Sequence, residues 1–467
     1  MNAAFAGKRV VVAGIAVSGV AAAEALLDRG ASVLVVDGRA GEHEQDAAGR
    51  LRARGAEVRL GDAESPVDAE LVVVSPGWRP SQPLLAAVLQ AGVEVIGEPE
   101  LAWRIRDPET VWLGVTGTNG KTTTVGMLES ILSAAGLRAI AAGNVGLPLT
   151  TAVLERPRYD ALAVELSSFQ LHWSSSLGFQ ASTVLNVAPD HLDWHGSMAS
   201  YAADKAKIWS EGACVLYNAD DEWSTRLARG RHDAHDFGIE AGHQFALVDG
   251  WIEQYGIGPE KRLAPVDAIR LPGAHNLSNA VAATGLAYLF NLRGDGAYVS
   301  ADAITAGLRA YEPGAHRNAL VAEGHGVRWV DDSKATNPHA AAASLSSYPS
   351  VVWIAGGLFK GADVERLVAE QAGRLRGVVV IGVDRTSLLS ALARHAPDVP
   401  VVEVTDRDTD TVSGVMTAAV AAAHRLAAAG DTVLLAPAAA SMDQFRDYAE
   451  RGDRFADAAR RLSADRT

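Results

Sequence analysis

Short runs of valine, isoleucine and leucine alternate with alanine-rich stretches of helical length along the whole chain, and this alternation limits the possible folds more than any other feature. The runs expected to form strands cover residues 9–13, 32–37, 71–74, 111–115, 162–165, 183–186, 327–331, 351–355, 378–381 and 432–436. Strands that are apolar on both faces and separated by helices are typical of parallel sheets with helices on both sides. The sequence therefore predicts an α/β protein.

Two breaks in this alternation predict three domains in the 467 residues. Asp107-Pro108 follows a predicted helix and precedes a new strand, and Pro313-Gly314 ends another helix. Proline and glycine commonly end regular elements. We therefore expect domains at residues 1–106, 107–313 and 314–467, each of an ordinary size for an α/β domain.

The composition disfavours several classes of protein. The chain has 42 lysine and arginine residues against 56 aspartate and glutamate residues, a formal net charge of −14. We expect no nucleic-acid partner, because such a chain lacks a broad basic face. It has no apolar run of about 18 residues, so we expect no membrane span. The single cysteine, Cys214, cannot form an intramolecular disulfide, which fits a reducing cytoplasm.

The start of the chain allows two interpretations. Residues 10–23 form an apolar run after Lys8-Arg9 and in this respect resemble a secretory signal peptide. Gly14 and Ser18 interrupt the run, and a second strand-like run follows at residues 32–37. These features favour a first β-α-β unit.

The strongest local signal is the glycine-rich segment 114–123, Gly-Val-Thr-Gly-Thr-Asn-Gly-Lys-Thr-Thr, between a predicted strand and a helix expected to start near Lys121. Backbone N–H groups in such a turn bind phosphate, the lysine adds a positive charge, and the Thr122 hydroxyl can bind Mg²⁺. The usual pattern has glycine where this chain has Val115. A flexible turn with an exposed lysine is the alternative.

Other polar residues lie where ligands of metals occur. Glu165 ends a predicted strand, at the carboxyl edge where α/β sites form, and its carboxylate can hold Mg²⁺ or cap a turn. His191 follows Asp190, and such a histidine alone is as often an ordinary loop residue as a ligand. Lys205 lies on an amphipathic stretch and alone is interpreted as a solvated helix lysine.

Two further motifs suit nucleotides. Asn276 and Asn279 lie on one face at the start of a predicted helix, where their amides can bind adenine or cap the helix. Near the N-terminus, Ala16 replaces the middle glycine of a dinucleotide-binding motif, and Asp37 follows at about the distance that suits an NAD ribose. A purely structural β-α turn is the alternative there.

In their order along the chain, the motifs resemble those of the ATP-dependent Mur ligases of peptidoglycan synthesis, and the resemblance covers essentially the whole chain. The segments that carry it are Thr116-Gly-Thr-Asn-Gly-Lys-Thr122, Gly143-Asn-Val-Gly-Leu-Pro148, Glu165-Leu-Ser-Ser-Phe-Gln170, Asn186-Val-Ala-Pro-Asp-His-Leu-Asp193, Tyr201-Ala-Ala-Asp-Lys205, His275-Asn-Leu-Ser-Asn279, His316-Arg317, Asp332-Ser-Lys-Ala-Thr-Asn337, Gly356-Gly-Leu-Phe-Lys360 and Pro437-Ala-Ala-Ala-Ser-Met-Asp-Gln-Phe445. The resemblance implies a Rossmann-like N-terminal domain, a central P-loop ATPase-type domain and a C-terminal Rossmann-like domain.

The resemblance also implies a site for ATP and two Mg²⁺ ions, with Lys205 carbamylated by CO₂. The metal ligands would be Thr122, Glu165, His191 and carbamylated Lys205. The catalytic residues would be Lys121, Glu165, His191 and Lys205. ATP would contact Gly117, Thr118, Asn119, Gly120, Lys121, Thr122, Thr123, Asn276, Asn279, Arg317 and Asp332. After Arg317 the chain departs from the family, because Asn318-Ala319 replace an aromatic or apolar residue and a glutamate.

Within the family, the segment Asp332-Ser-Lys-Ala-Thr-Asn337 is most similar to members that add D-glutamate to UDP-N-acetylmuramoyl-L-alanine through an acyl phosphate. The resemblance therefore implies these two small molecules as substrates of a monomeric cytoplasmic enzyme. The uridine nucleotide would contact Val17, Ser18, Asp37, Arg39, Gly77, Asn144 and His191. D-Glutamate would contact Lys334, Thr336, Lys360, Ser441 and Tyr448.

Three other functions stay open at this point. A related folylpolyglutamate synthetase would not need a uridine pocket in the first domain. An ATP-driven switch or motor subunit would hydrolyse ATP without an acyl acceptor. A nicotinamide-dependent oxidoreductase would use the first domain, although Ala16 and the downstream Gly120-Lys121-Thr122 segment argue against it.

Overall fold

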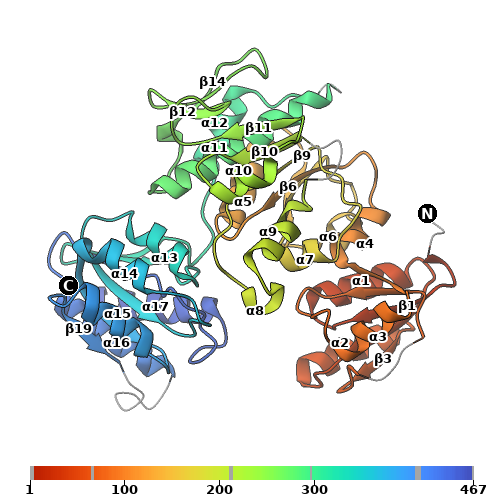
Figure 1. The fold of residues 1–467 in the computed structure, drawn as a ribbon, viewed down its shortest axis with the longest axis horizontal. Helices are drawn as coiled ribbons and strands as arrows, with labels where there is room; N and C mark the ends of the chain where they lie inside the picture. The colour runs from red at the N-terminus through yellow and green to blue at the C-terminus, as the bar shows by residue number, and fades with distance from the viewer. Residues whose placement is uncertain (1–4, 65–67, 210–213, 295–296, 405–411, 465–467) are drawn as a thin grey trace. The chain divides into compact units, whose positions relative to one another are not determined.

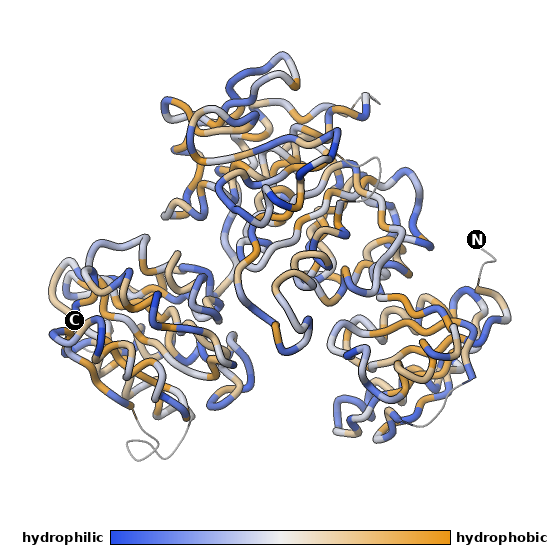
Figure 2. Tube along the Cα trace, viewed as in Figure 1, coloured by the Kyte–Doolittle hydropathy of each residue, from blue (hydrophilic) through white to orange (hydrophobic). Residues whose placement is uncertain are grey.

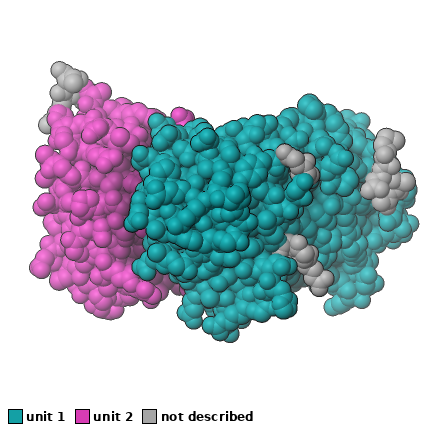
Figure 3. Space-filling model, turned by 90° about the horizontal axis from the view of Figure 1, so that it is seen from above, with its two compact units in different colours: residues 1–187, 191–270, 278–311 teal, residues 188–190, 271–277, 312–467 magenta. Residues whose placement is uncertain are grey.

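The computed structural model describes residues 5–64, 68–209, 214–294, 297–404 and 412–464, and within them the chain forms three β-sheets covered by helices (Figure 1). Hydrophobic and hydrophilic segments alternate along the trace, as the sequence pattern predicts (Figure 2). The chain divides into two compact units (Figure 3). Residues 1–187, 191–270 and 278–311 form the first unit, and residues 188–190, 271–277 and 312–467 form the second.

The first sheet has five parallel strands in the order β3-β2-β1-β4-β5. They are β3 (Glu57–Leu60), β2 (Ser32–Asp37), β1 (Arg9–Ala13), β4 (Leu71–Val74) and β5 (Glu94–Gly97), with helices α1 (Val17–Leu27), α2 (Glu42–Ala53), α3 (Pro83–Gln90) and α4 (Glu98–Ile105). A Cβ on Gly19 would lie 1.8 Å from the carbonyl oxygen of Gly14, so glycine lets α1 pack directly against the turn after β1. The predicted β-α-β start is confirmed.

The second sheet has nine strands in the order β14-β13-β12-β11-β10-β9-β6-β8-β7. Three predicted strands lie in this sheet: β6 (Val111–Thr116), β8 (Ala161–Glu165) and β9 (Ala181–Val184). Three further strands pair with them or with one another in parallel: β7 (Ala139–Gly143), β10 (Cys214–Asn218) and β11 (Ala234–Phe237). Strands β12 (Phe245–Val248), β13 (Trp251–Gln254) and β14 (Arg262–Pro265) pair antiparallel with one another. These three strands were not predicted, and they run antiparallel to one another because short connections join them.

Helices after the strands of the second sheet carry the candidate site. They are α5 (Lys121–Ala134), α6 (Leu149–Ala152), α7 (Ser168–His172), α8 (Leu192–His195), α9 (Met198–Ala206), α10 (Glu222–Ala228), α11 (Ala274–Leu289) and α12 (Ala301–Ala310). The start of α5 at Lys121 confirms the predicted strand–loop–helix order.

The third sheet has six strands in the order β15-β16-β20-β17-β18-β19. They are β15 (Ala319–Gly324), β16 (Val327–Asp331), β20 (Thr432–Leu435), β17 (Val351–Gly356), β18 (Leu375–Ile381) and β19 (Val401–Glu403), with only β15 antiparallel to its neighbour among these described strands. Helices α13 (Pro338–Leu345), α14 (Glu365–Gln371), α15 (Thr386–His395), α16 (Val412–Leu426) and α17 (Tyr448–Ala464) accompany it. Along β17, Val351 and Trp353 enter one apolar cluster and Val352 and Ile354 another, so the sheet buries both faces.

The element order agrees with the predicted three-domain organisation. Helix α4 ends at Ile105 before β6 begins at Val111, and α12 ends at Ala310 before β15 begins at Ala319. The limits 1–106, 107–313 and 314–467 stay predictions. Across the described ranges, no helix combines the length and apolar character needed to cross a membrane.

Candidate active site

The glycine-rich turn lies between β6 and α5 and needs its glycines for two reasons. Gly117 and Gly120 have φ angles of +158° and +84°, which favour glycine. A Cβ on Gly120 would also lie 2.3 Å from Oδ1 of Asn279, so this asparagine packs against the turn. The first amides of α5 have no acceptor within the helix, which makes its N-terminus an anion-binding position.

Asn186 fixes the shape of this turn. Its carbonyl oxygen accepts the Thr118 N–H at 2.9 Å, and its side-chain Oδ1 accepts the Asn119 N–H at 2.9 Å. Its Nδ2 donates to the carbonyl oxygen of Asn119 at 3.1 Å. The sequence motif contained Asn186, but its spacing alone gave no sign of this role.

The ammonium of Lys121 turns back over the loop. Its Nζ donates to the carbonyl oxygens of Gly117 and Thr118 at 2.8 and 2.9 Å. The interpretation as a flexible turn with an exposed lysine is wrong, because this amine is only partly exposed and is held inside the loop. A polyphosphate bound by the turn would meet a fixed positive charge there.

Thr122 and Glu165 form a pair of oxygen donors beside the loop. The Thr122 hydroxyl donates to Glu165 Oε2 at 2.7 Å, and Asn144 Nδ2 donates to Oε1 of the same carboxylate at 2.8 Å. Glu165 ends β8 and is 2% exposed. A hydroxyl and a carboxylate are hard oxygen ligands of the kind that Mg²⁺ prefers, so these residues fit the predicted ion.

Lys205 is buried against the same loop, so its interpretation as a solvated helix lysine is wrong. It is 1% exposed, and its Nζ donates to the carbonyl oxygen of Gly117 at 2.8 Å and lies 4.5 Å from the centre of the Tyr201 ring. The Tyr201 hydroxyl lies 3.1 Å from Thr118 Oγ1. Helix α9 is therefore fastened to the phosphate loop by two side chains.

His191 precedes α8 in a left-handed conformation, with φ of +52°, and its ring lies 4.8 Å from that of Phe169. Within the described part of the chain, no three His, Cys, Asp or Glu side chains are arranged to hold a metal ion by themselves. The predicted ligand set contains only two such residues, Glu165 and His191. Its other two members, Thr122 and a modified Lys205, supply oxygens of a different kind.

Asn276 and Asn279 are both buried, at 4% and 6% exposure, at the start of α11. Nδ2 of Asn276 donates to the carbonyl oxygen of Pro272 at 2.7 Å, so one of its donors supports the turn before the helix. Adenine recognition by this pair stays a prediction.

The predicted uridine residues surround the turn after β1. Asp37 is 5% exposed, and its carboxylate accepts the backbone N–H groups of Ile15 and Arg39, both at 2.9 Å. Burial alone would raise the pKa of Asp37, but the hydrogen bonds from Arg39 and Ile15 outweigh it and hold this pKa below its usual range. The Asp37 carboxylate thus stabilises the turn after β1 through bonds within the protein.

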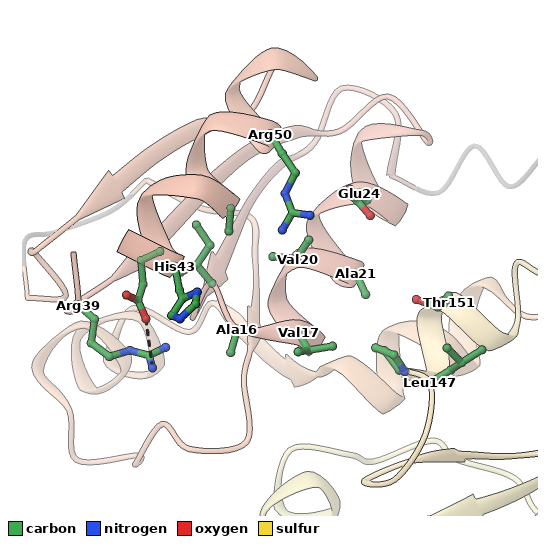
Figure 4. Close-up of a pocket in the computed structure, with 14 residues that line it drawn as sticks. Ala16, Val17, Val20, Ala21, Glu24, Arg39, His43, Arg50, Leu147 and Thr151 are labelled. Atoms are coloured by element: carbon green, nitrogen blue, oxygen red, sulfur yellow. Dashed lines mark ion pairs between the residues drawn. The ribbon is translucent and has the colours of Figure 1, made fainter. Parts of the chain in front are cut away.

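A cavity of about 590 Å³ opens beside this turn (Figure 4). Val17 and Arg39 line it, whereas Ser18, Asp37 and Gly77 do not. Figure 4 shows Arg39 on one side of the cavity and Leu147 and Thr151 on the other. The lining is mostly apolar and also carries Arg39, Arg50, Glu24 and Glu44, and a concave apolar wall with a few polar groups suits a nucleotide-sized ligand.

In the second compact unit, three loops meet after β16, β17 and β20. Nζ of Lys334 lies 3.7 Å from the centre of the Tyr448 ring, and Ser333 Oγ donates to the carbonyl oxygen of Tyr448 at 2.7 Å. The loop of Lys360 pairs with that of Ser441 through the backbone of Leu358 and Ala440. Thr336 lies two residues after Lys334. The predicted D-glutamate residues therefore gather at the carboxyl ends of parallel strands, where α/β ligand sites form.

A buried cation joins two of these loops and was missed in the sequence. Arg451 on α17 has no exposed surface, and its guanidinium donates to Ser333 Oγ and O, both at 2.9 Å, and to the carbonyl oxygen of Ala439 at 3.1 Å. Burial lowers the pKa of Arg451 to about 10. A helix arginine gives no sequence signal for such a role, because its partners lie far away in the chain.

Arg317 and Asp332 lie at the start of the same unit. The Asn318 N–H donates to Asp332 Oδ1 at 3.3 Å, and the Tyr348 hydroxyl donates to Asn318 Oδ1 at 2.5 Å. His316 Nδ1 lies 2.6 Å from Asp331, and the carboxylate raises the pKa of this histidine. The departure from the family at Asn318 is thus accommodated by a local tyrosine.

Together, the phosphate-binding turn, the lysine within it and the strand-end carboxylate beside the Thr122 hydroxyl define an ATP-dependent enzyme with a P-loop-type α/β domain. Three family models match the chain: "Mur ligase MurD-like, N-terminal domain" at residues 8–97, "Mur ligase middle domain" at 115–287 and "Mur ligase, glutamate ligase domain" at 316–439. The chain belongs to the Mur ligase family, which confirms the predicted family and its three-domain α/β architecture.

Known relatives match over nearly the full length. A UDP-N-acetylmuramoylalanine–D-glutamate ligase from Streptomyces avermitilis is 52% identical, with 98% of this chain and 99% of the relative covered. One of the same name from Thermobifida fusca is 51% identical at the same coverage. Among solved structures, a pseudomurein peptide ligase type C from Methanothermus fervidus has a TM-score of 0.60 at 17% identity, covering 98% of this chain and all of that one. The structural likeness at this identity concerns the fold alone.

Proposed function

We propose that the protein is an ADP-forming ligase that adds D-glutamate to UDP-N-acetylmuramoyl-L-alanine in peptidoglycan precursor synthesis. The observation that carries this proposal is the group of side chains around the phosphate-binding turn, which we call the loop site. Lys121 and Lys205 both donate to the carbonyl oxygen of Gly117 there, and the Thr122 hydroxyl donates to Glu165. The names of the full-length relatives support the choice of substrates.

The reaction has two steps. The carboxylate of the bound alanine attacks the γ-phosphorus of ATP, and ADP leaves as an acyl phosphate forms. The amine of D-glutamate then attacks the acyl carbon, and phosphate leaves from the tetrahedral intermediate as the amide bond forms and the amine loses a proton. Such phosphoryl transfer depends on positioning and on neutralised charge.

The residues of the loop supply both the positioning of the phosphates and the positive charge. Lys121 and the N-terminal amides of α5 bind the β- and γ-phosphates, while Gly117, Thr118, Asn119, Gly120, Thr122 and Thr123 shape the turn. Asn276, Asn279, Arg317 and Asp332 bind the rest of ATP. Thr122 and Glu165 would hold one Mg²⁺, and His191 and Lys205 the second. Bound Mg²⁺ supplies positive charge that lets a carboxylate approach a triphosphate.

Carbamylation of Lys205 is part of the proposal. It converts an amine into an anionic oxygen ligand. The buried amine beside Gly117 supports it, because an unmodified ammonium at this position would add charge without binding a metal. An intact mass of the protein with CO₂ supplied, about 44 Da above the unmodified chain, would agree with it. A fully active enzyme of unmodified mass and plain lysine density would contradict it.

The two acid substrates are assigned to residues of different compact units. Val17, Ser18, Asp37, Arg39 and Gly77 bind the uridine nucleotide, while Asn144 and His191 orient its muramoyl-alanine arm. Lys334 and Lys360 pair with the two carboxylates of D-glutamate, and Thr336, Ser441 and Tyr448 orient it. Charge-assisted hydrogen bonds of this kind favour a dicarboxylate. The proposal includes a monomeric enzyme in the cytoplasm, the compartment of its nucleotide substrates.

The test is phosphate release with each amino acid and each muramoyl nucleotide in turn. We expect release only with D-glutamate and UDP-N-acetylmuramoyl-L-alanine together. Release with L-glutamate and a folate would assign the chain to folylpolyglutamate synthesis instead. ATP hydrolysis without either co-substrate would indicate a switch or motor subunit, and NAD binding by titration would favour an oxidoreductase.

A further inference from the structure

A buried chain of hydrogen bonds links α7, α8 and α9 and takes no part in the mechanism above. Nδ1 of His195 lies 3.0 Å from Asp204 Oδ2, and Nε2 of the same ring lies 2.9 Å from Ser168 Oγ. Asp204 also accepts from Nδ1 of His172 at 2.9 Å and from Nζ of Lys207 at 2.9 Å. We call Ser168, His195 and Asp204 the serine–histidine–aspartate chain.

The order of atoms is that of a hydrolytic triad, but burial excludes this use. The side chain of His195 has no exposed surface, and Ser168 is 2% exposed. The His195 ring stacks on Phe169, with centres 5.5 Å apart and planes 6° from parallel. A substrate carbonyl cannot reach the serine hydroxyl, so the chain cannot act as a nucleophilic site.

The polar groups of this chain are mutually satisfied. Asp204 Oδ2 lies within hydrogen-bond distance of Nδ1 of both His172 and His195, and Oδ1 lies 2.9 Å from Nζ of Lys207. Because both ring nitrogens of His195 have a partner, Asp204 on one side and Ser168 on the other, the orientation of the ring is fixed.

The members of the chain lie beside the proposed metal ligands in sequence. Ser168 is the first residue of α7, three positions after Glu165. His195 ends α8, which His191 precedes, and Asp204 comes directly before Lys205 on α9. Of the four segments that carry a proposed metal ligand, those of Glu165, His191 and Lys205 therefore contribute one member each, and that of Thr122 contributes none.

We propose that Ser168, His195 and Asp204 are positioning residues that hold the segments of Glu165, His191 and Lys205 at fixed separations for divalent-cation binding. The proposal rests on the ligase function and ligand assignment above. Groups that orient metal ligands change metal affinity or activity by roughly 10- to 100-fold when they are removed.

The test measures Mn²⁺ binding by electron paramagnetic resonance, with a non-hydrolysable ATP analogue on the full chain. We expect Asp204→Ala to weaken Mn²⁺ binding about tenfold or more. Ser168→Ala should weaken it less, because it breaks one hydrogen bond of the chain, and His195→Asn, at a ring with two such bonds, should have an intermediate effect. Asp204→Asn should restore part of the affinity by keeping an acceptor. In turnover, kcat should fall and half-saturation by Mg²⁺ should rise, with an unchanged KM for D-glutamate.

A second histidine–aspartate pair provides the control. His243, between β11 and β12, has its Nδ1 2.8 Å from Asp236 of β11, far in sequence from the phosphate-binding turn, and His243→Asn should leave Mn²⁺ binding unchanged. If Asp204→Ala does not fold, the single-hydroxyl change Ser168→Ala decides the question. Wild-type Mn²⁺ affinity in folded Ser168→Ala and His195→Asn overturns the proposal. Normal Mn²⁺ binding without D-glutamate-dependent phosphate release would instead overturn the ligase function alone.

Discussion

At the scale of single residues, Lys121 is bound to the carbonyl oxygens of its own loop and is also the proposed partner of the ATP phosphates. Nζ of Lys121 donates to two loop carbonyls, and those bonds are modest because each carbonyl could also be solvated. A polyphosphate offers a stronger, charge-assisted acceptor. The lysine is thus held near its ligand at little cost to the fold.

We therefore expect Lys121→Ala to lower kcat by at least about 100-fold, the loss typical for a group that stabilises developing charge. The free energy of unfolding should fall by about 1–3 kcal/mol with the fold kept, because hydrogen bonds of a partly exposed ammonium to Gly117 and Thr118 are lost. Steady-state phosphate release and chemical denaturation measure both quantities. Lys261→Ala, at an exposed lysine paired with Glu253, is the control, and near-wild-type turnover by Lys121→Ala would remove the phosphate-loop assignment.

At the scale of elements, α17 stabilises two substrate loops through one side chain. Arg451→Met should cost about 2–4 kcal/mol of unfolding free energy, because it leaves the buried oxygens of Ser333 and Ala439 without their donor. The KM for D-glutamate should rise as the two loops separate. Arg454→Met, on the exposed face of the same helix, should cost less than about 0.5 kcal/mol. Equal losses in the two variants would contradict this account.

A second element contact makes stability depend on pH. Glu98 at the start of α4 is 2% exposed and accepts from the N–H and the hydroxyl of Thr150, at 2.5 and 2.8 Å. Burial raises its pKa from 4.5 to about 7 in the folded chain. The folded state therefore holds a proton that the unfolded state has lost, so this contribution to stability is present below pH 4.5 and is lost as the pH rises through 7.

Glu98→Gln keeps an acceptor for Thr150 and removes the ionisation. We expect equal stability of the two proteins near pH 4, and a variant more stable by up to about 3 kcal/mol at pH 8. Urea denaturation across this range measures the difference. A difference that does not vary with pH would show that Glu98 is ionised at no cost in the folded protein.

The elements also show what could be predicted from the sequence. The strand–loop–helix at Lys121 was predicted because its glycines and lysine are neighbours in the chain. Strand β9 ends two residues earlier than predicted. The Leu185 N–H still bonds Thr116 of β6, but Asn186 bonds the phosphate-binding turn at Thr118 and Asn119 instead. The burial of Lys205 could not be predicted, since its partner Gly117 lies 88 positions away.

At the scale of the whole molecule, the two compact units predict that unfolding is not a single two-state transition. Mg²⁺ and ATP at about 100 times their dissociation constant should stabilise the transition of the phosphate-loop unit by about 2.7 kcal/mol. Calorimetry with and without a chelator measures the shift, and Lys121→Ala should lose most of it. A shift of equal size in that variant would place the nucleotide elsewhere.

The edge strand β14 affects whether copies of this protein can pair through their sheets at high concentration. It carries Arg262, which is charged, and Pro265, which lacks a backbone N–H. An incoming strand from another copy would find a repelling side chain and a missing donor at that border. At the β14 edge, the nine-stranded sheet therefore resists extension by a strand of another copy, which disfavours fibril growth from this side.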